Sequence, residues 1–127
     1  MANINLSDGE WKLMSLIWEG SPLTVTQLVR LLSDDTGWSK ATVLVMLRRM
    51  EQKGAVRFEQ DGKSKRYLPA VPKEGVAAAE TESFLQKVYG GSVGLLVSSM
   101  ASQKALSRQD IDELYKILKK AEKEAGQ

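Results

Sequence analysis

Few side chains in this chain are suited to catalysis or to metal binding. The 127 residues contain neither cysteine nor histidine, which removes thiolate and imidazole metal ligands, disulfides, thiol nucleophiles and the usual general base. The adjacent pair Ser39 and Lys40 comes nearest to an activated nucleophile, but a helix cap followed by a phosphate contact explains it more simply. We therefore expect no catalytic residue, no metal site and no cofactor.

Positive charge is the second chemical feature, and it is concentrated in the middle of the chain. Residues 39–73 carry nine basic and three acidic side chains, a net charge of +6, whereas residues 1–38 carry −3 and residues 74–127 carry −1. A basic block of this kind is either a solvated face or a surface that binds a polyanion such as nucleic acid. The elements that contain the block decide between these interpretations.

Three short helices are predicted over residues 8–20, 24–32 and 39–53. Each is opened by a serine or threonine, the residues preferred at an N-cap, and the first two have Glu or Gln three positions later as a capping box. Apolar residues three and four positions apart give each helix one buried face. Gly54 supplies a C-terminal stop for the third helix.

A β-hairpin is predicted next, over residues 55–69. Its two runs carry Val, Phe and Tyr and are separated by Asp61-Gly62, a dipeptide favoured in two-residue hairpin loops. Three helices followed by a hairpin is the order of a winged helix-turn-helix, in which the third helix enters the major groove and the hairpin, or wing, reaches along the backbone. Because the basic block coincides with the third helix and the wing, this order favours DNA binding.

The position of the loop also predicts the pairing of the two strands. A loop at Asp61-Gly62 places Val56 opposite Tyr67 on a buried face and Arg57 opposite Arg66 on the other face. Like charges directly opposite are unfavourable, so the two arginines either splay into solvent or hold an anion between them.

The outward face of the third helix combines apolar and basic side chains. On a helical wheel Val43, Leu47 and Met50 face inward, which leaves Leu44 and Val45 outward. Apolar side chains in the major groove can pack on thymine C5-methyl groups, and the alternative is that Val45 belongs to the core. The candidate DNA-binding residues are Thr24, Ser39, Lys40, Ala41, Thr42, Leu44, Val45, Arg48, Arg57, Lys63, Lys65 and Arg66.

The last third of the chain predicts three more helices, over residues 74–89, 92–102 and from Ser107 onward. Residues 92–102 are apolar on nearly every side, which requires burial from more than one direction. Interlocking with a second copy explains this pattern most simply, and a helical cap within one chain is the alternative. The candidate dimerisation residues are Phe84, Leu85, Val88, Tyr89, Val93, Leu96, Val97, Met100, Ile111, Leu114, Ile117 and Leu118.

The predicted fold is therefore mainly α (α+β class). A winged helix-turn-helix DNA-binding domain over residues 1–72 is followed by a three-helix dimerisation domain over residues 73–127. The chain opens without a basic region leading into an apolar one, and its longest apolar run, Val93–Val97, is far shorter than the roughly 20 residues of a membrane span. We expect a cytoplasmic protein with no membrane insertion.

Several short motifs resemble the penicillinase-repressor family, BlaI/MecI/CopY, over about residues 6–120. They are Trp38-Ser39 followed by Thr42-Val43, the run Leu47–Gly54, the wing Asp61-Gly62-Lys63 to Arg66-Tyr67, Phe84 to Tyr89-Gly90-Gly91, and Leu106-Ser107 to Ile111–Leu114. The resemblance implies a homodimeric winged-helix transcriptional repressor that binds pseudo-palindromic operators in double-stranded DNA, with the carboxy-terminal helices as the dimer interface.

The resemblance also implies how such repressors are released from DNA. In the β-lactam branch a membrane-bound sensor or protease leads to cleavage of an Asn-Phe bond, which aligns with Ser99-Met100 here, so the family's residue pair is missing. The copper-responsive branch senses its inducer through carboxy-terminal cysteines, which this chain lacks. The family's recognition-helix positions fall on Ser39, Lys40, Ala41, Thr42 and Val45.

Two other classes of function stay open at the level of the sequence. One is a ligand-gated regulator that holds a small molecule between the winged domain and the helices, which would need a sizeable apolar pocket with convergent polar groups. The other is a winged helix that serves as a protein-interaction module and binds duplex DNA weakly even at low salt.

Overall fold

A computed structural model describes residues 4–126, and the chain divides between Thr81 and Glu82 into two compact units. In chain order the elements within the described residues are α1 (Asp8–Gly20), α2 (Val25–Leu31), α3 (Lys40–Lys53), β1 (Val56–Asp61), β2 (Ser64–Pro69), α4 (Lys73–Tyr89), α5 (Val93–Ser102) and α6 (Arg108–Ala125). The predicted fold class is confirmed, because three helices and an antiparallel hairpin come first and three helices follow.

The helices begin where their capping residues predict. Ser7 and Thr24 each form the capping box expected of them, and the Ser39 side chain accepts a hydrogen bond from the amide of Thr42. At the other end of α3, Gly54 has φ 82°, the left-handed conformation that commonly ends a helix. These caps fix the bounds of α3 and therefore which of its side chains face outward.

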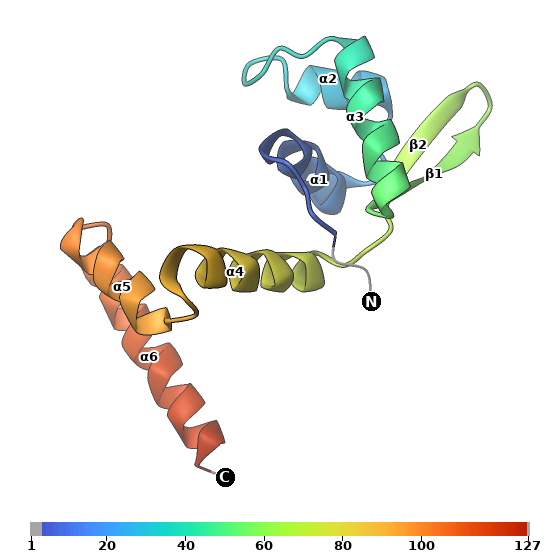
Figure 1. Ribbon diagram of the computed structural model, residues 1–127. Coiled ribbons are helices and arrows are strands. Elements are labelled where there is room, and N and C mark those ends of the chain that lie inside the picture. Colours follow the sequence, from blue (N-terminus) through green and yellow to red (C-terminus); the bar gives the residue numbers. More distant parts are fainter. Residues whose placement is uncertain (1–3, 127) are drawn as a thin grey trace. The chain divides into compact units, whose positions relative to one another are not determined.

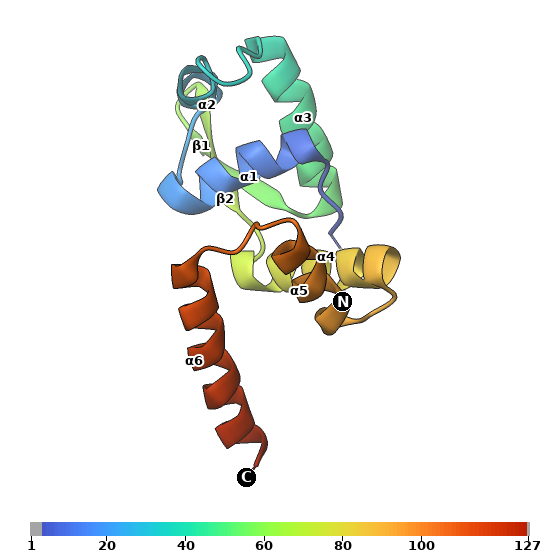
Figure 2. The ribbon, with the colours of Figure 1, turned by 90° about the vertical axis from the view of Figure 1, so that its left-hand side faces the viewer.

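One hydrophobic core holds α1, α2, α3 and the hairpin together (Figures 1 and 2). The inward face predicted for α3 is confirmed, since Val43, Leu47 and Met50 are fully buried. Leu44 is 38% exposed and Val45 is 48% exposed, so the alternative that placed Val45 in the core is wrong. The hairpin leaves this cluster with its loop pointing away from the helices in Figure 1.

The register of the hairpin differs from the predicted one. Asp61 lies opposite Ser64, so the two-residue loop is Gly62-Lys63 and not Asp61-Gly62. Gly62 has φ 62°, and a two-residue hairpin loop needs a positive φ at its first position, which glycine adopts without strain.

The arginine pair expected across the hairpin is therefore absent. Arg57 lies opposite Leu68, and Arg66 lies opposite Glu59. The observed register replaces two like charges with one pair of opposite charges, which favours it over the predicted one. Each arginine also has a carboxylate nearby, Arg57 with Glu59 at 3.6 Å and Arg66 with Asp61 at 3.0 Å. No anion is needed between the two guanidinium groups.

The faces of the hairpin are nevertheless as predicted, because the register is shifted by two residues and side chains alternate with a period of two. Val56 and Tyr67 are both buried, at 3% and 2% exposure. Their partners across the ladder are Pro69 and Phe58, and the rings of Phe58 and Tyr67 lie 6.0 Å apart.

Helix α4 begins against the first unit. Its Val76 is buried with the core of α1 to α3, and just before the helix the Trp18 indole donates a hydrogen bond of 2.9 Å to the carbonyl of Val71. The first turns of α4 therefore pack with the winged unit, and the division between the two units falls within this helix.

The second unit contains the end of α4 with α5 and α6. Ser92 caps α5, and Ser107 forms a capping box with Asp110 at the start of α6. No residue of α5 or α6 is buried among those described. Within the described residues no helix is both long and apolar enough to cross a membrane.

Candidate nucleic-acid interface

A groove of about 280 Å³ opens on the winged unit. It lies where the start of α2, the first turns of α3 and the hairpin meet, and it is lined by Thr24, Val25, Thr26, Lys40, Leu44, Gln60, Lys63, Ser64, Lys65 and Tyr67. The groove brings together five of the candidate DNA-binding residues, namely Thr24, Lys40, Leu44, Lys63 and Lys65.

A short strand-like bridge lies beside the groove. The amide of Leu23 donates to the carbonyl of Tyr67 at 3.1 Å, and the amide of Tyr67 donates to the carbonyl of Leu23 at 2.8 Å. Because Leu23 directly precedes the cap of α2, this pair of hydrogen bonds fixes the start of α2 beside β2. Both ends of the bridge are buried.

The remaining candidates on α3 lie on its exposed outer face and not in the groove. Ala41, Thr42, Val45 and Arg48 are all exposed. The Ser39 hydroxyl donates a hydrogen bond of 3.1 Å to the hydroxyl oxygen of Thr42, which leaves the Thr42 proton free to be donated outward. The outer face of α3 therefore presents one hydroxyl, two apolar side chains and one guanidinium group.

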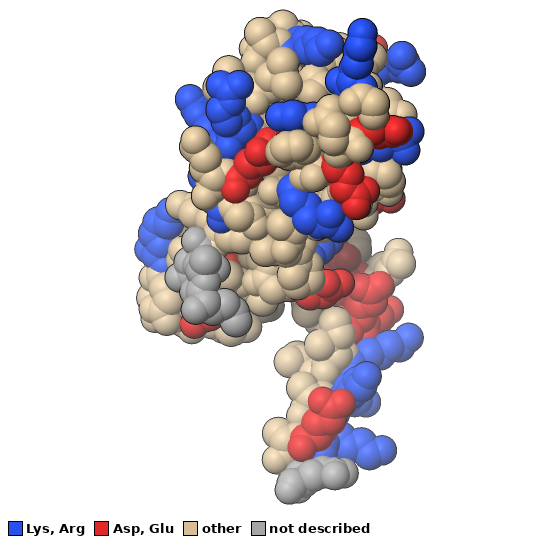
Figure 3. Space-filling model, turned by 90° about the vertical axis from the view of Figure 1, so that its right-hand side faces the viewer, with Lys and Arg blue, Asp and Glu red and all other residues tan. Residues whose placement is uncertain are grey.

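The basic side chains of this region fall into two groups. Arg57 and Arg66 are held in ion pairs on the hairpin. No carboxylate within residues 4–126 forms an ion pair with Lys40, Arg48, Lys63 or Lys65. Figure 3 views the side of the molecule toward which the hairpin extends, and it shows lysine and arginine side chains spread over the winged unit, with acidic side chains among them.

Five of the residues that line the groove were not among the DNA-binding candidates from the sequence, namely Val25, Thr26, Gln60, Ser64 and Tyr67. Gln60 Nε2 donates to the carbonyls of Gly62 at 3.1 Å and Ser64 at 3.4 Å, so it braces the loop that carries Lys63. Thr26 is exposed on the first turn of α2. Gln60 and Ser64 could have been identified from the sequence, because they lie beside the predicted hairpin loop, whereas nothing in the sequence points to Thr26.

Tyr67 also lines the groove. Burial raises the pKa of its phenol, the carboxylate of Glu51 raises it further, and the Arg48 guanidinium partly opposes the increase. The phenol therefore keeps its proton at neutral pH and can donate a hydrogen bond. Lys65 reaches over the neighbouring Phe58 ring with its Nζ 4.2 Å from the ring centroid, which holds this cation beside the groove.

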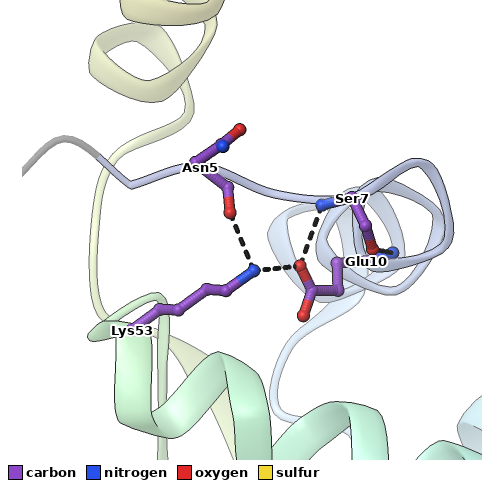
Figure 4. Close-up of polar contacts among 4 residues, drawn as sticks. All are labelled: Asn5, Ser7, Glu10 and Lys53. Atoms are coloured by element: carbon purple, nitrogen blue, oxygen red, sulfur yellow. Dashed lines mark hydrogen bonds and ion pairs between the residues drawn. The ribbon is translucent and has the colours of Figure 1, made fainter.

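A polar network ties the end of α3 to the start of α1 (Figure 4). Lys53 Nζ donates to Glu10 Oε1 at 2.5 Å and to the carbonyl of Asn5 at 2.8 Å, while the amide of Ser7 donates to the same Glu10 oxygen at 2.8 Å. Burial of the Glu10 carboxyl raises its pKa, but the Lys53 ammonium and the hydrogen bonds from Lys53 and Ser7 outweigh this effect, and the pKa is lowered overall. The network fixes one end of α3 and so contributes to its orientation.

The candidate dimerisation residues lie on α4, α5 and α6, and most of them are exposed. Phe84, Val88, Val93, Val97, Met100, Ile117 and Leu118 are between 36% and 62% exposed, and the others are half-buried. A second hollow, of about 250 Å³, lies within the second unit and is lined by Val97, Met100, Leu106, Asp110, Glu113, Leu114 and Ile117. Ser99 and Met100, which align with the family's cleaved bond, lie within α5.

The comparisons with known proteins agree with this geometry. The family model described as penicillinase repressor matches residues 6–120. The penicillinase repressor of Bacillus licheniformis is 31% identical over 113 residues, which cover 89% of this chain and 88% of that protein. The methicillin resistance regulatory protein MecI of Staphylococcus aureus (strain N315) is 27% identical over 115 residues, which cover 91% of this chain and 94% of that protein.

The winged unit also has a counterpart among solved structures. The solution structure of Bacillus licheniformis BlaI, in its monomeric form in complex with the blaP half-operator, matches with a TM-score of 0.50 and 31% identity. The match covers 58% of this chain and 92% of that one. The resemblance stated from the sequence is thus confirmed, since the family match spans the winged unit and most of the second unit. This chain belongs to the penicillinase repressor family.

Proposed function

We propose that this chain is a transcriptional repressor that binds a pseudo-palindromic operator as a homodimer, with α3 in the major groove and the hairpin along the phosphate backbone. The observation that carries the proposal is the groove in which Lys40 of α3 and Lys63 and Lys65 of the hairpin converge without carboxylate partners among the described residues. Membership of a repressor family and the BlaI structure with a half-operator support it.

The outer face of α3 suits a major groove. An α-helix with its side chains is about 10–12 Å across, and the major groove of B-DNA is about 12 Å wide. Thr42 offers a hydroxyl to a base edge or a phosphate, while Lys40 and Arg48 carry the charge that phosphates attract. Thr42 is therefore proposed to read bases, and the two cations to set the position of the helix.

The hairpin is proposed to act mainly through charge. Lys63 lies in the loop and Lys65 on β2, and both are exposed. Arg57 and Arg66 are at least 49% exposed in their ion pairs, and exposed pairs contribute only about 0–1 kcal/mol, so DNA phosphates can compete with Glu59 and Asp61 for them. The hairpin should then contribute affinity without sequence preference.

A second copy is proposed to cover the apolar side chains of α4, α5 and α6. Val93, Ile117 and Leu118 are each about 60% exposed in the single chain, and exposed apolar side chains gathered on neighbouring helices are typical of an interface. A two-fold axis between two copies would present two α3 helices to two half-sites, which matches a pseudo-palindromic operator.

The test is a fluorescence anisotropy titration of the full chain against two labelled duplexes at 50 mM and 200 mM salt. One duplex is the DNA upstream of the chain's own gene, and the other has the same base composition in scrambled order. We expect a preference for the upstream duplex by a factor of about 10³ or more. Each cation that contacts a phosphate should also add about 0.9 to the slope of log affinity against log salt.

Lys63→Ala is the variant that tests the hairpin, and Lys119→Ala on α6 is its matched control. Both replace an exposed lysine, but only Lys63 lines the groove. Lys63→Ala should weaken binding to both duplexes alike and reduce the salt slope by about 0.9, and Lys119→Ala should change neither. Equal and weak binding of the unmodified chain to both duplexes at both salt concentrations would refute the proposed function.

A further inference from the structure

We infer that Val45, together with Ala41 one turn before it, contacts a thymine C5-methyl group in each half-site and so sets part of the sequence preference. The inference rests on the proposed function. It concerns the one part of the outer face of α3 that neither charge nor hydrogen bonding explains.

The position of Val45 on α3 is the first observation. Val43, Leu47 and Met50 are fully buried, so Ala41 and Val45 lie close to the opposite side of the helix, the side that points away from the core. Val45 is 48% exposed and takes no part in the hydrophobic core of the winged unit. Part of the apolar surface of Val45 is therefore exposed to solvent and available to a partner.

The charges around Val45 identify what covers it. Lys40 precedes it on the same helix, Arg48 follows it, and neither forms an ion pair with any carboxylate of the described residues. An apolar site between unpaired cations is unsuited to an apolar protein partner, and it matches a surface whose rim is anionic and whose floor carries small apolar groups. A duplex has that arrangement, with phosphates along both edges of the major groove and methyl groups on the base edges between them.

The chemistry of Ala41 and Val45 selects the base. Neither side chain can donate or accept a hydrogen bond. Thymine alone presents a methyl group to the major groove, whereas guanine, cytosine and adenine are distinguished there by their hydrogen-bond donors and acceptors. A polar base edge pressed against Val45 loses hydrogen bonds to water without replacement, so thymine is favoured both by contact and by the exclusion of the other bases.

Leu44 provides a matched comparison on the same helix. It is apolar and 38% exposed, similar to Val45, but it lines the groove beside Lys65 and Tyr67. Leu44 thus faces the hairpin, whereas Val45 faces directly outward. Removing either side chain should leave the fold intact, because both are exposed, but only the loss of Val45 should alter the response to a thymine methyl group.

The experiment uses duplexes that the protein itself selects from a random pool. In the most enriched duplex each thymine is replaced by deoxyuridine, which lacks only the C5-methyl group, at symmetric positions of both half-sites. At one pair of positions we expect about a 15-fold loss of affinity, since one buried methyl-sized group corresponds to about fourfold, or ~0.8 kcal/mol, in each half-site. Val45→Ala should bind the thymine and deoxyuridine duplexes with equal affinity, and Leu44→Ala should keep the 15-fold difference.

The outcomes separate this inference from the proposed function. If the pool yields no enriched sequence, the proposed function and the inference both fail. If a sequence is enriched but deoxyuridine has no effect at any position, the inference is overturned and the proposed function stands. The same holds if Val45→Ala retains the full difference between the two duplexes. A difference that Val45→Ala removes and Leu44→Ala keeps supports the inference.

Discussion

Replacing Lys53 by methionine should destabilise the winged unit, although Lys53 is an exposed residue at the end of α3. Methionine keeps most of the apolar stem and removes the ammonium group. Glu10, with its side chain 4% exposed, then loses the ion pair that compensates for its burial, and the carbonyl of Asn5 loses a donor. A buried carboxylate left without a cation is one of the costliest defects in a folded protein.

The size of the effect follows from the exposure of the two partners. Breaking a fully buried pair costs about 3–5 kcal/mol, but the Lys53 side chain is 36% exposed, and water can reach the carboxylate once it has gone. A hydrogen bond to a charged group contributes about 1.5–3 kcal/mol. We therefore expect a loss of about 2 kcal/mol, which corresponds to a fall in Tm of about 8–16 °C for a unit of this size.

The effect should depend on pH in a definite direction. In the unmodified chain the pKa of Glu10 is lowered, so its contribution to stability is present above the unfolded value of 4.5 and is lost as the pH falls through the folded pKa. In Lys53→Met burial acts without the cation, and the Glu10 pKa rises. The difference in stability between the two proteins should be largest near pH 7. It should shrink as the pH falls below 4.5 and through the lowered pKa of Glu10 in the unmodified chain, below which the carboxyl is protonated in both proteins.

Urea unfolding followed by tryptophan fluorescence is the assay. All three tryptophans, Trp11, Trp18 and Trp38, lie in the winged unit, so the signal reports the unfolding of that unit alone. The double variant Glu10→Gln with Lys53→Met should recover part of the loss, because no buried charge remains. A loss below about 0.5 kcal/mol at pH 7, or a loss that is the same at pH 3.5, would refute the role assigned to this ion pair.

Three further predictions concern the interface and the assembly. Gly62→Ala should cost about 1 kcal/mol in urea unfolding because its φ of 62° strains any other residue, and an unchanged midpoint would contradict the loop conformation. Thr42→Ala should weaken operator binding by about 1–3 kcal/mol in anisotropy titrations and affect scrambled DNA less, whereas equal losses on both duplexes would exclude base reading. Leu118→Asp, at a residue 62% exposed on α6, should halve the mass found by sedimentation equilibrium if this face joins two copies, and an unchanged mass would place the interface elsewhere.

Local sequence signals predicted most of the winged unit. Helix starts follow from capping boxes whose partners are three residues apart, and the outward position of Val45 follows from the helical period alone. The hairpin faces were also predictable, because their period is two, but the register was not. It depends on which pairing avoids opposing Arg57 and Arg66 and on where Gly62 falls in the loop.

Contacts between residues far apart in the chain account for what the sequence did not predict. The ion pair of Lys53 with Glu10 spans 43 positions, and the bridge between Leu23 and Tyr67 joins the segment before α2 to strand β2. No local pattern of spacing encodes either contact, since each arises from how the helices pack. The groove that Tyr67 and Gln60 line depends on that bridge, so these two residues became candidates only in the folded structure.

The two-residue period of the hairpin has a consequence for how such repressors can diverge. A pairing shifted by two residues leaves Val56 and Tyr67 facing the core, so inserting two residues into each strand near the loop would lengthen the hairpin without disturbing a buried side chain. Each such step adds about 6.8 Å of reach, or about two base pairs along the duplex. The number of phosphates within reach of the hairpin is therefore a quantity that evolution can change in discrete steps, independently of the core and of the bases that α3 faces.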